Sequence, residues 1–180
     1  SESGQRDNTL VVFLSDNGGL STSEEGVPTS NLPYAEGKGW SEEGGLRIPW
    51  LVRWPRRVPA QRISDDVIWQ CDLYPTLLAA AGLPAEPEHH VDGTDLLQTM
   101  IVGRPLARST SLCWHYPHYS NQGGGPTGAI RDGDWKLIEW YESRRTALYN
   151  LREDVSESFD RSAAEPARAA DLLKRLRAWR

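Results

Sequence analysis

An acidic and an amide side chain follow directly on an apolar segment near the start of the sequence. Residues 9–14 are continuous in apolar and β-branched types, and S-D-N-G-G follows at 15–19. Loops beyond the carboxyl ends of strands commonly carry the ligand site of α/β sheets. The Asp16 carboxylate and the Asn17 amide oxygen together suit a hard cation, Ca²⁺ or in its place Mg²⁺, so both are candidate metal ligands. A plain turn is the alternative, because Asn-Gly also favours hairpins.

A lysine stands among glycines about twenty residues later. Lys38 lies in E-G-K-G-W at 36–40, and a further glycine pair follows at 44–45. Glycines allow close approach of the backbone to a ligand and positive φ angles. The lysine ammonium is a compact positive charge that can stabilise a tetrahedral oxyanion. We expect Lys38 to bind substrate and to act in catalysis, and a solvated surface lysine is the alternative. Glu43 and Arg47 are expected to hold the loop.

Two histidines alternate with tyrosines in the second half of the chain. His115 and His118 stand in W-H-Y-P-H-Y at 114–119, and N-Q-G-G-G follows at 121–125. Aromatic faces stack on sugars and imidazoles donate hydrogen bonds, so both histidines are candidate substrate-binding residues at the rim of a sugar or aryl pocket. Ordinary edge-strand residues are the alternative. A metal site is less favoured, since no carboxylate or cysteine has matching spacing.

Composition excludes several classes of protein. The 180 residues include 20 Lys and Arg against 25 Asp and Glu, a net charge of −5, with no basic block to favour nucleic acid as a partner. No apolar run is longer than that at 10–14, which is far shorter than the roughly 20 residues of a membrane span. Arg outnumbers Lys 17 to 3, which hints at a bacterial gene. Cys71 and Cys113 could be bridged, although two buried free thiols are the commoner outcome. Nothing in the sequence indicates an oligomeric state.

The elements that must position these residues divide the chain near residue 105. Residues 1–104 are expected to form an α/β part with a buried strand at 9–14, a long loop at 15–45 and a second strand at 48–54. A helix follows Asp72, a good N-cap, and ends at Gly82. A short helix is expected at 95–102.

Residues 105–180 are expected to form a small antiparallel sheet packed by one helix. Period-two segments predict four strands at 111–116, 128–131, 135–141 and 147–151, with a turn at Asp132-Gly133. Pro166 opens a C-terminal helix. The apolar face of this helix comprises Ala169, Leu172, Leu173, Leu176 and Trp179.

The motifs occur in an order that resembles the sulfatase family of the alkaline-phosphatase-like superfamily. S-D-N-G-G is followed by G-K-G-x-x-x-E-G-G-x-R-x-P at 37–49 and by D-L-Y-P-T-L-L at 72–78. I-R-D-G-D-W-K-L-I at 130–138 and Y-N-L at 149–151 resemble the C-terminal region of bacterial arylsulfatase-like enzymes. The resemblance implies the C-terminal part of an alkaline-phosphatase-like α/β domain followed by the small sheet and helix.

The resemblance also implies a role for each matching residue. Asp16 and Asn17 would be metal ligands, usually for Ca²⁺, and Lys38 would contact a sulfate oxygen. The family's nucleophile is a formylglycine made within C/S-x-P-x-R, and this pattern is absent from the 180 residues. The chain therefore resembles a fragment that is inactive alone, the rest of the site lying upstream. The substrate would be a small-molecule or glycan sulfate ester.

Two other functions remain open at this point. One is a phosphate or phosphonate ester hydrolase of the same superfamily, although such enzymes commonly have His at the position of Asn17. The other is a non-catalytic binding module or pseudoenzyme that keeps the scaffold. A periplasmic or secreted location is the family's usual habit.

Overall fold

The structure is a computed structural model that describes residues 4–22, 26, 28–106 and 108–180. The chain forms two compact units, here named the ribbon unit (Ser1–Asp16 and Pro49–Ser109) and the sheet unit (Asn17–Ile48 and Thr110–Arg180). Residues 17–48 thus pack with the C-terminal part of the chain. The division expected near residue 105 stays a prediction about the domains of the protein.

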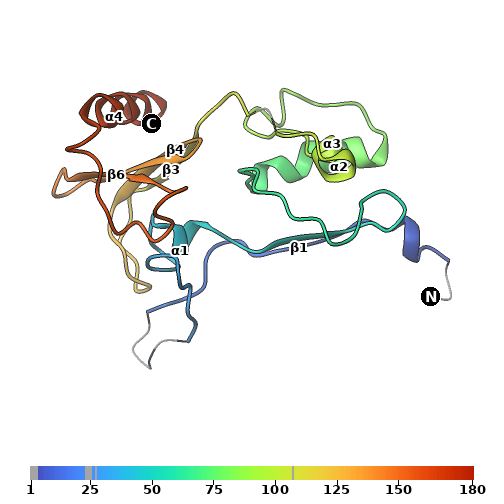
Figure 1. Cartoon of the computed structure of the whole chain (residues 1–180), viewed down its shortest axis with the longest axis horizontal. Coiled ribbons are helices and arrows are strands. Elements are labelled where there is room, and N and C mark those ends of the chain that lie inside the picture. The colour runs from blue at the N-terminus through green and yellow to red at the C-terminus, as the bar shows by residue number, and fades with distance from the viewer. Residues whose placement is uncertain (1–3, 23–25, 27, 107) are drawn as a thin grey trace. The chain divides into compact units, whose positions relative to one another are not determined.

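The ribbon unit is built on a two-stranded antiparallel pair with Phe13 opposite Leu51. Figure 1 shows β1 in this unit together with α2 and α3. Its elements are η1 (Arg6–Asn8), β1 (Val11–Leu14), β2 (Trp50–Arg53), η2 (Gln70–Asp72), α2 (Leu73–Ala81) and α3 (Leu97–Val102). Both expected strands and both expected helices are therefore present. Gly82 ends α2 with φ 71°, a conformation that glycine adopts without a steric penalty.

The prediction of a fully buried first strand is wrong for the described chain. Val11 and Phe13 are 47% and 63% exposed, and Leu51 beside them is 58% exposed. Val12 and Leu14, which point to the other face of the pair, are half-buried. Side chains alternate between the two faces of a strand, and the ribbon unit covers only one of them.

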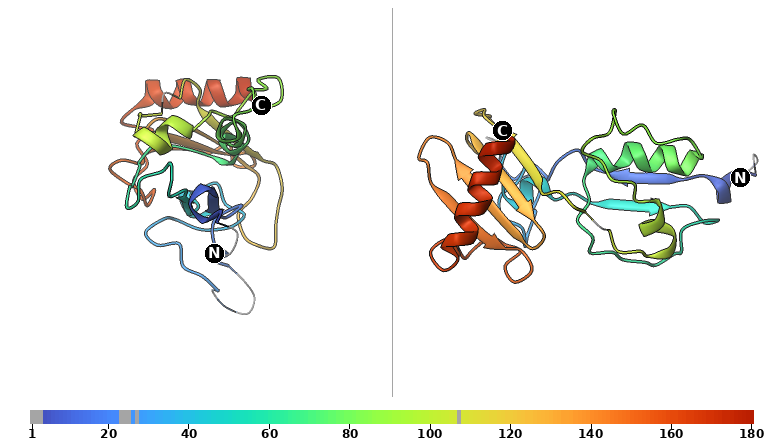
Figure 2. Two further views of the ribbon diagram at one scale, coloured as in Figure 1. Left: turned by 90° about the vertical axis from the view of Figure 1, so that its right-hand side faces the viewer. Right: turned by 90° about the horizontal axis from the view of Figure 1, so that it is seen from above.

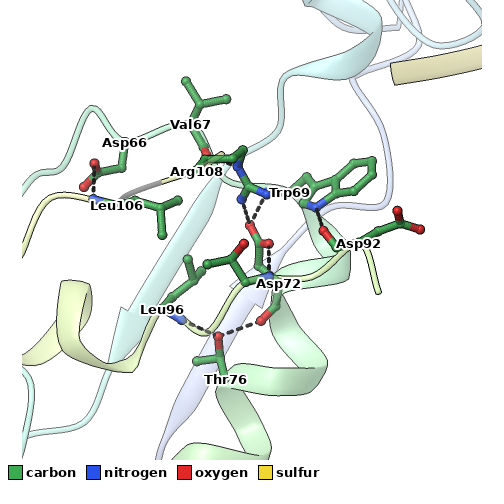
Figure 3. A network of polar contacts seen from close by, with 10 residues as sticks. Asp66, Val67, Trp69, Asp72, Thr76, Asp92, Leu96, Leu106 and Arg108 are labelled. Carbon is green, nitrogen blue, oxygen red and sulfur yellow. Dashed lines mark hydrogen bonds and ion pairs between the residues drawn. The ribbon is translucent and has the colours of Figure 1, made fainter. Parts of the chain in front are cut away.

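Asp72 lies at the predicted helix start, but its carboxylate does not cap the helix (Figure 3). It accepts hydrogen bonds from the backbone amides of Trp69 (3.0 Å) and Thr94 (2.8 Å), and from the Arg108 guanidinium at 2.5 Å. Thr76 extends the network by accepting from the Leu96 amide at 2.9 Å. Because Asp72 is fully buried, its charge requires these donors, and the network joins segments far apart in the sequence.

The sheet unit contains a four-stranded antiparallel sheet in the order β3-β4-β5-β6. Its elements are α1 (Glu43–Leu46), β3 (Leu112–Tyr116), β4 (Thr127–Asp132), β5 (Trp135–Trp140), β6 (Thr146–Asn150) and α4 (Pro166–Trp179). All four expected strands and the final helix are confirmed. The single turn α1, inside the segment expected to be loop, was missed by sequence reasoning.

Helix α4 packs across one face of this sheet (Figure 2, right). Leu172 and Leu176 of α4 lie in a cluster with Ile130, Leu137 and Leu148 from the three strands β4–β6. Trp179 was expected on the same apolar face but is 52% exposed, since it stands at the last residue of the helix. The opposite face of the sheet carries a second cluster: Ala129, Ile138, Ala147, Tyr149 and Leu151.

The two cysteines are unbridged. Cys113 is buried within the first cluster, and burial raises the pKa of its thiol to about 11. The expectation of two free thiols is therefore confirmed. The expectation that both are buried is wrong, because Cys71 is exposed. Among the described residues, no helix is both long and apolar enough to cross a membrane.

Candidate active site

The S-D-N-G-G loop rests on the single turn α1. The Gly18 amide donates to the Gly45 carbonyl at 2.9 Å, and a β-carbon at Gly18 would lie 1.7 Å from the Gly44 oxygen. Only glycine permits two backbone segments to approach so closely. The glycines at 18 and at 44–45 therefore match one another, and they fix the backbone that follows Asn17.

The lysine loop is fastened to the same segment. The Lys38 amide donates to the Gly19 carbonyl at 3.0 Å. The Asn31 side chain bonds to both of these backbone segments. Its Oδ1 accepts a hydrogen bond from the Gly19 amide at 3.1 Å, and its Nδ2 donates to the carbonyl oxygens of Gly19 (2.8 Å) and Glu36 (2.9 Å). The structure thus brings the Asn17 loop and Lys38 together. Sequence reasoning missed Asn31, since no local pattern marks it.

Lys38 has an environment suited to an anion. Its side chain is half-buried and makes no hydrogen bond or ion pair with any residue that the structure describes. Glu36 before it adopts φ 60°, a sparsely populated conformation that tends to occur at functional sites. An ammonium without a carboxylate partner among the described residues, on a glycine-bounded backbone, is available to a tetrahedral oxyanion.

The two candidate metal ligands are neighbours in sequence, with Asp16 at the end of its segment of the ribbon unit and Asn17 at the start of the sheet unit. Asp16 is exposed and its carbonyl accepts from Gln70 Nε2 at 2.9 Å, while within the described chain its carboxylate has no partner. Asn17 is half-buried. No group of three or more His, Cys, Asp or Glu in the described part of the chain could hold a metal. The Asp16 carboxylate and the Asn17 amide oxygen are chemically suited to a hard cation, but these two side chains alone are an incomplete ligand set.

The Gly-rich loop after His118 packs against the lysine loop. A β-carbon at Gly124 would lie 2.1 Å from the Gly39 carbonyl oxygen, and one at Gly123 would lie 2.4 Å from Trp40 Nε1. The Thr22 hydroxyl donates to the Gln122 carbonyl, which connects the loop after Asn17 to the Gly-rich loop. Three loops, at 17–22, 37–40 and 120–124, therefore meet within the sheet unit.

Two polar atoms buried among these loops lack a hydrogen-bond partner within the described chain. They are the Ser21 hydroxyl oxygen and the Trp40 indole nitrogen. A β-carbon at Gly37 would lie 2.4 Å from the Ser21 hydroxyl, so this group points at the lysine loop. Buried polar groups without partners are rare in folded proteins.

His115 and His118 are both exposed, but they do not act as a pair. His115 lies on β3 with its Nδ1 2.7 Å from the Tyr141 hydroxyl, and the Arg180 guanidinium stacks over the Tyr141 ring, 4.7 Å from its centroid. His118 makes an edge contact with Tyr116 at 5.6 Å between ring centroids. Sequence reasoning missed Tyr141, which reaches His115 only because β3, β4 and β5 are neighbours in the sheet.

The expected loop-holding roles of Glu43 and Arg47 are confirmed. Arg47 stacks over the Tyr34 ring at 4.8 Å. Glu43 is buried, and its Oε1 lies 2.9 Å from Lys136 Nζ. Burial raises the pKa of the nearby Glu157 carboxyl, and the Lys136 ammonium acts in the opposite direction. The buried positions of Lys136 and Glu157 were not predicted from the sequence, because a lysine in a strand ordinarily faces solvent.

Comparison with known proteins decides the family. Residues 37–178 match the family described as N-sulphoglucosamine sulphohydrolase, C-terminal. The chain belongs to the sulfatase family. The match covers the lysine loop, the four-stranded sheet and helix α4, so the resemblance seen in the motifs is confirmed.

Individual sulfatases agree with this assignment. A sulfatase of Formosa agariphila is 31% identical across 98% of this chain and 34% of its own length. The human N-acetylgalactosamine-6-sulfatase is 42% identical over 102 residues, 57% of this chain and 20% of the relative. The chain thus spans about a third or less of the length of these relatives.

The fold is confirmed by solved structures. The crystal structure of Ps i-CgsB in complex with k-i-k-neocarrahexaose has a TM-score of 0.84 and 34% identity, covering 99% of this chain and 38% of that one. The expected fold class is therefore correct: the C-terminal part of an alkaline-phosphatase-like α/β domain, then a small antiparallel sheet with a C-terminal helix.

Proposed function

We propose that the protein carrying this chain is a sulfuric ester hydrolase, and that Lys38 binds the sulfate group in it. The observation that carries the proposal is that Lys38 is half-buried and that its ammonium has no partner in the described chain, although its backbone amide is hydrogen-bonded to Gly19. Such a group can stabilise the charge that develops on sulfate oxygens as the ester S–O bond breaks. Membership of the sulfatase family supports the same reaction.

We also propose that Asp16 and Asn17 contribute oxygen ligands to a Ca²⁺ ion. Bound there, a cation would polarise the sulfate ester as a Lewis acid. Asn17 supports Ca²⁺ over Zn²⁺, because a neutral amide oxygen is a hard ligand and imidazole is the softer one. The remaining ligands and a formylglycine nucleophile would come from outside these 180 residues.

A glycan sulfate ester is the substrate class that we propose. The Ps i-CgsB structure, 34% identical, is a complex with k-i-k-neocarrahexaose. In this chain, the exposed His115 with its Tyr141 partner and the exposed His118 offer polar and aromatic groups of the kind that bind sugars. A secreted or periplasmic location stays a prediction from the family.

The test uses the full-length protein and a fluorogenic aryl sulfate. We expect turnover that requires Ca²⁺ and that falls about 100- to 1000-fold in Lys38→Ala, as for the loss of one charge-stabilising donor. Lys174→Ala is the matched control, because Lys174 is exposed on α4. Turnover of the matching phosphate ester instead would favour the phosphatase alternative. No turnover of either ester would favour a binding module, and an unaffected Lys38→Ala would remove Lys38 from the site.

A further inference from the structure

A fully buried lysine stands behind the active-site loops. Lys136 of β5 has no exposed surface, and its Nζ lies 2.9 Å from Glu43 Oε1 and 2.9 Å from Glu157 Oε1. The Glu43 amide also donates to Glu157 Oε2 at 2.6 Å, and Arg131 Nη1 lies 3.5 Å from Glu43 Oε2. We call these four residues the lysine cluster. Its two cations and two carboxylates balance.

Stability alone is a poor explanation for this arrangement. Taking ions out of water carries a large desolvation penalty, and a buried ion pair can often be replaced by apolar side chains without loss of stability. Buried ionic groups are instead sometimes associated with the selection of one conformation.

The cluster holds the turn α1, on which both active-site loops rest. Glu43 is the first residue of α1, and the next two residues contact the loops. Gly45 accepts the Gly18 amide at 2.9 Å, and the Gly44 amide donates to Ala35 at 2.8 Å. A continuous path of contacts therefore runs from Lys136 through α1 to the segment after Asn17 and to the segment before Lys38.

The lysine cluster also neutralises a carboxylate in the segment that follows Lys38. Glu43 lies five residues after Lys38 in the sequence, and it is the carboxylate that Lys136 and Arg131 neutralise. Without Lys136, the cluster would hold a net negative charge beside the loops. Such a charge would oppose the binding of an anionic substrate.

We infer that Lys136 is a positioning residue, which orders the Asn17 and Lys38 loops through Glu43 and α1. This inference rests on the proposed function for its effect on catalysis, but its structural part can be tested alone. The loss of a supporting contact behind an active-site ligand typically lowers metal affinity or activity by about 10- to 100-fold.

The test compares variants of the full-length protein by amide hydrogen exchange without metal or substrate. In Lys136→Met, we expect the Gly18 and Lys38 amides to exchange about tenfold faster or more, because local opening sets their protection. Ca²⁺ affinity and kcat should fall about tenfold in parallel. Lys174→Met, at an exposed position of α4, should leave all three unchanged.

A double variant separates positioning from general damage. Lys136→Met with Glu157→Gln again balances the charges, and the side-chain amide introduced at position 157 still has a carbonyl oxygen that can accept from the Glu43 amide. We expect the double variant to recover much of the lost protection and affinity. Wild-type exchange in a folded Lys136→Met protein would overturn the inference, as would a double variant no better than the single one.

A further variant covers the case in which Lys136→Met does not fold. Glu157→Gln keeps the ion pair between Lys136 and Glu43, so a milder, few-fold acceleration of exchange at Gly18 and Lys38 is expected. Unchanged exchange there would overturn the inference. If no variant and no wild-type protein cleaves a sulfate ester, the proposed function fails, and the exchange data still decide the role of Lys136.

Discussion

The backbone amide of Lys38 donates a hydrogen bond of 3.0 Å to the carbonyl oxygen of Gly19, two residues after Asn17. This contact joins the candidate sulfate-binding lysine to the loop that carries a candidate metal ligand. A sulfate ester must meet a cation and a positive side chain together if both are to stabilise its oxygens. The hydrogen bond fixes the backbones of the two loops relative to each other.

Gly18→Ala is expected to disturb the contact between the loop after Asn17 and the turn α1. The new β-carbon would lie 1.7 Å from the Gly44 carbonyl oxygen, so one of the two backbone segments must move. Overpacking of this kind destabilises proteins by about 1–3 kcal/mol. Urea unfolding of the full-length protein measures the effect. Gly125→Ala is the matched control, since nothing lies within 4 Å of its β-carbon, and equal stability of the two variants would contradict the close approach of the two segments.

Asp16→Asn is expected to weaken Ca²⁺ binding by about tenfold or more. The substitution keeps the shape and an oxygen donor but removes the carboxylate charge, and charge count tunes Ca²⁺ affinity. Isothermal titration with Ca²⁺ gives the dissociation constant. Asp7→Asn, at another exposed acid of the ribbon unit, should bind as the wild type does. An unchanged constant in Asp16→Asn would exclude Asp16 as a ligand.

The ion pair of Asp132 with Arg175 should make stability depend on pH in the acid range. The hydrogen bond from Arg175, at 2.8 Å, lowers the pKa of Asp132 below its usual value of 3.8. A carboxylate with a lowered folded-state pKa contributes stability above its unfolded-state pKa and loses it as the pH falls through the folded value. We therefore expect Asp132→Asn to be less stable than the wild type at pH 7.

The difference between these two proteins should disappear at acid pH. Below the folded-state pKa of Asp132 the wild-type carboxyl is protonated, so it resembles the amide of the variant. Urea unfolding at pH 7 and at successively lower pH tests this. Because both side chains are partly exposed, salt should reduce the difference at pH 7. If the difference in stability between the wild type and Asp132→Asn did not shrink as the pH falls, the lowered pKa of Asp132 in the folded state would be contradicted.

Local patterns in the sequence predict most of the sheet unit. Alternating residues place β3–β6 to within one or two residues, and Pro166 with the leucines that follow predicts α4. These signals succeed because both faces of the sheet and one face of the helix are buried within the same unit. The pattern of Val11 and Phe13 predicts a strand correctly but misstates its burial, since burial depends on what lies opposite.

The motifs in the sequence predicted the sulfatase family and the candidate residues Asp16, Asn17 and Lys38, because the residue types in a short motif already limit the chemistry that it can perform. The residues that support these candidates became visible only in the folded structure. Asn31 clamps the Lys38 loop, Lys136 reaches Glu43 across 93 positions, and Glu43 meets Glu157 across 114. Contacts over such separations form only when the chain has folded, so no local pattern predicts them.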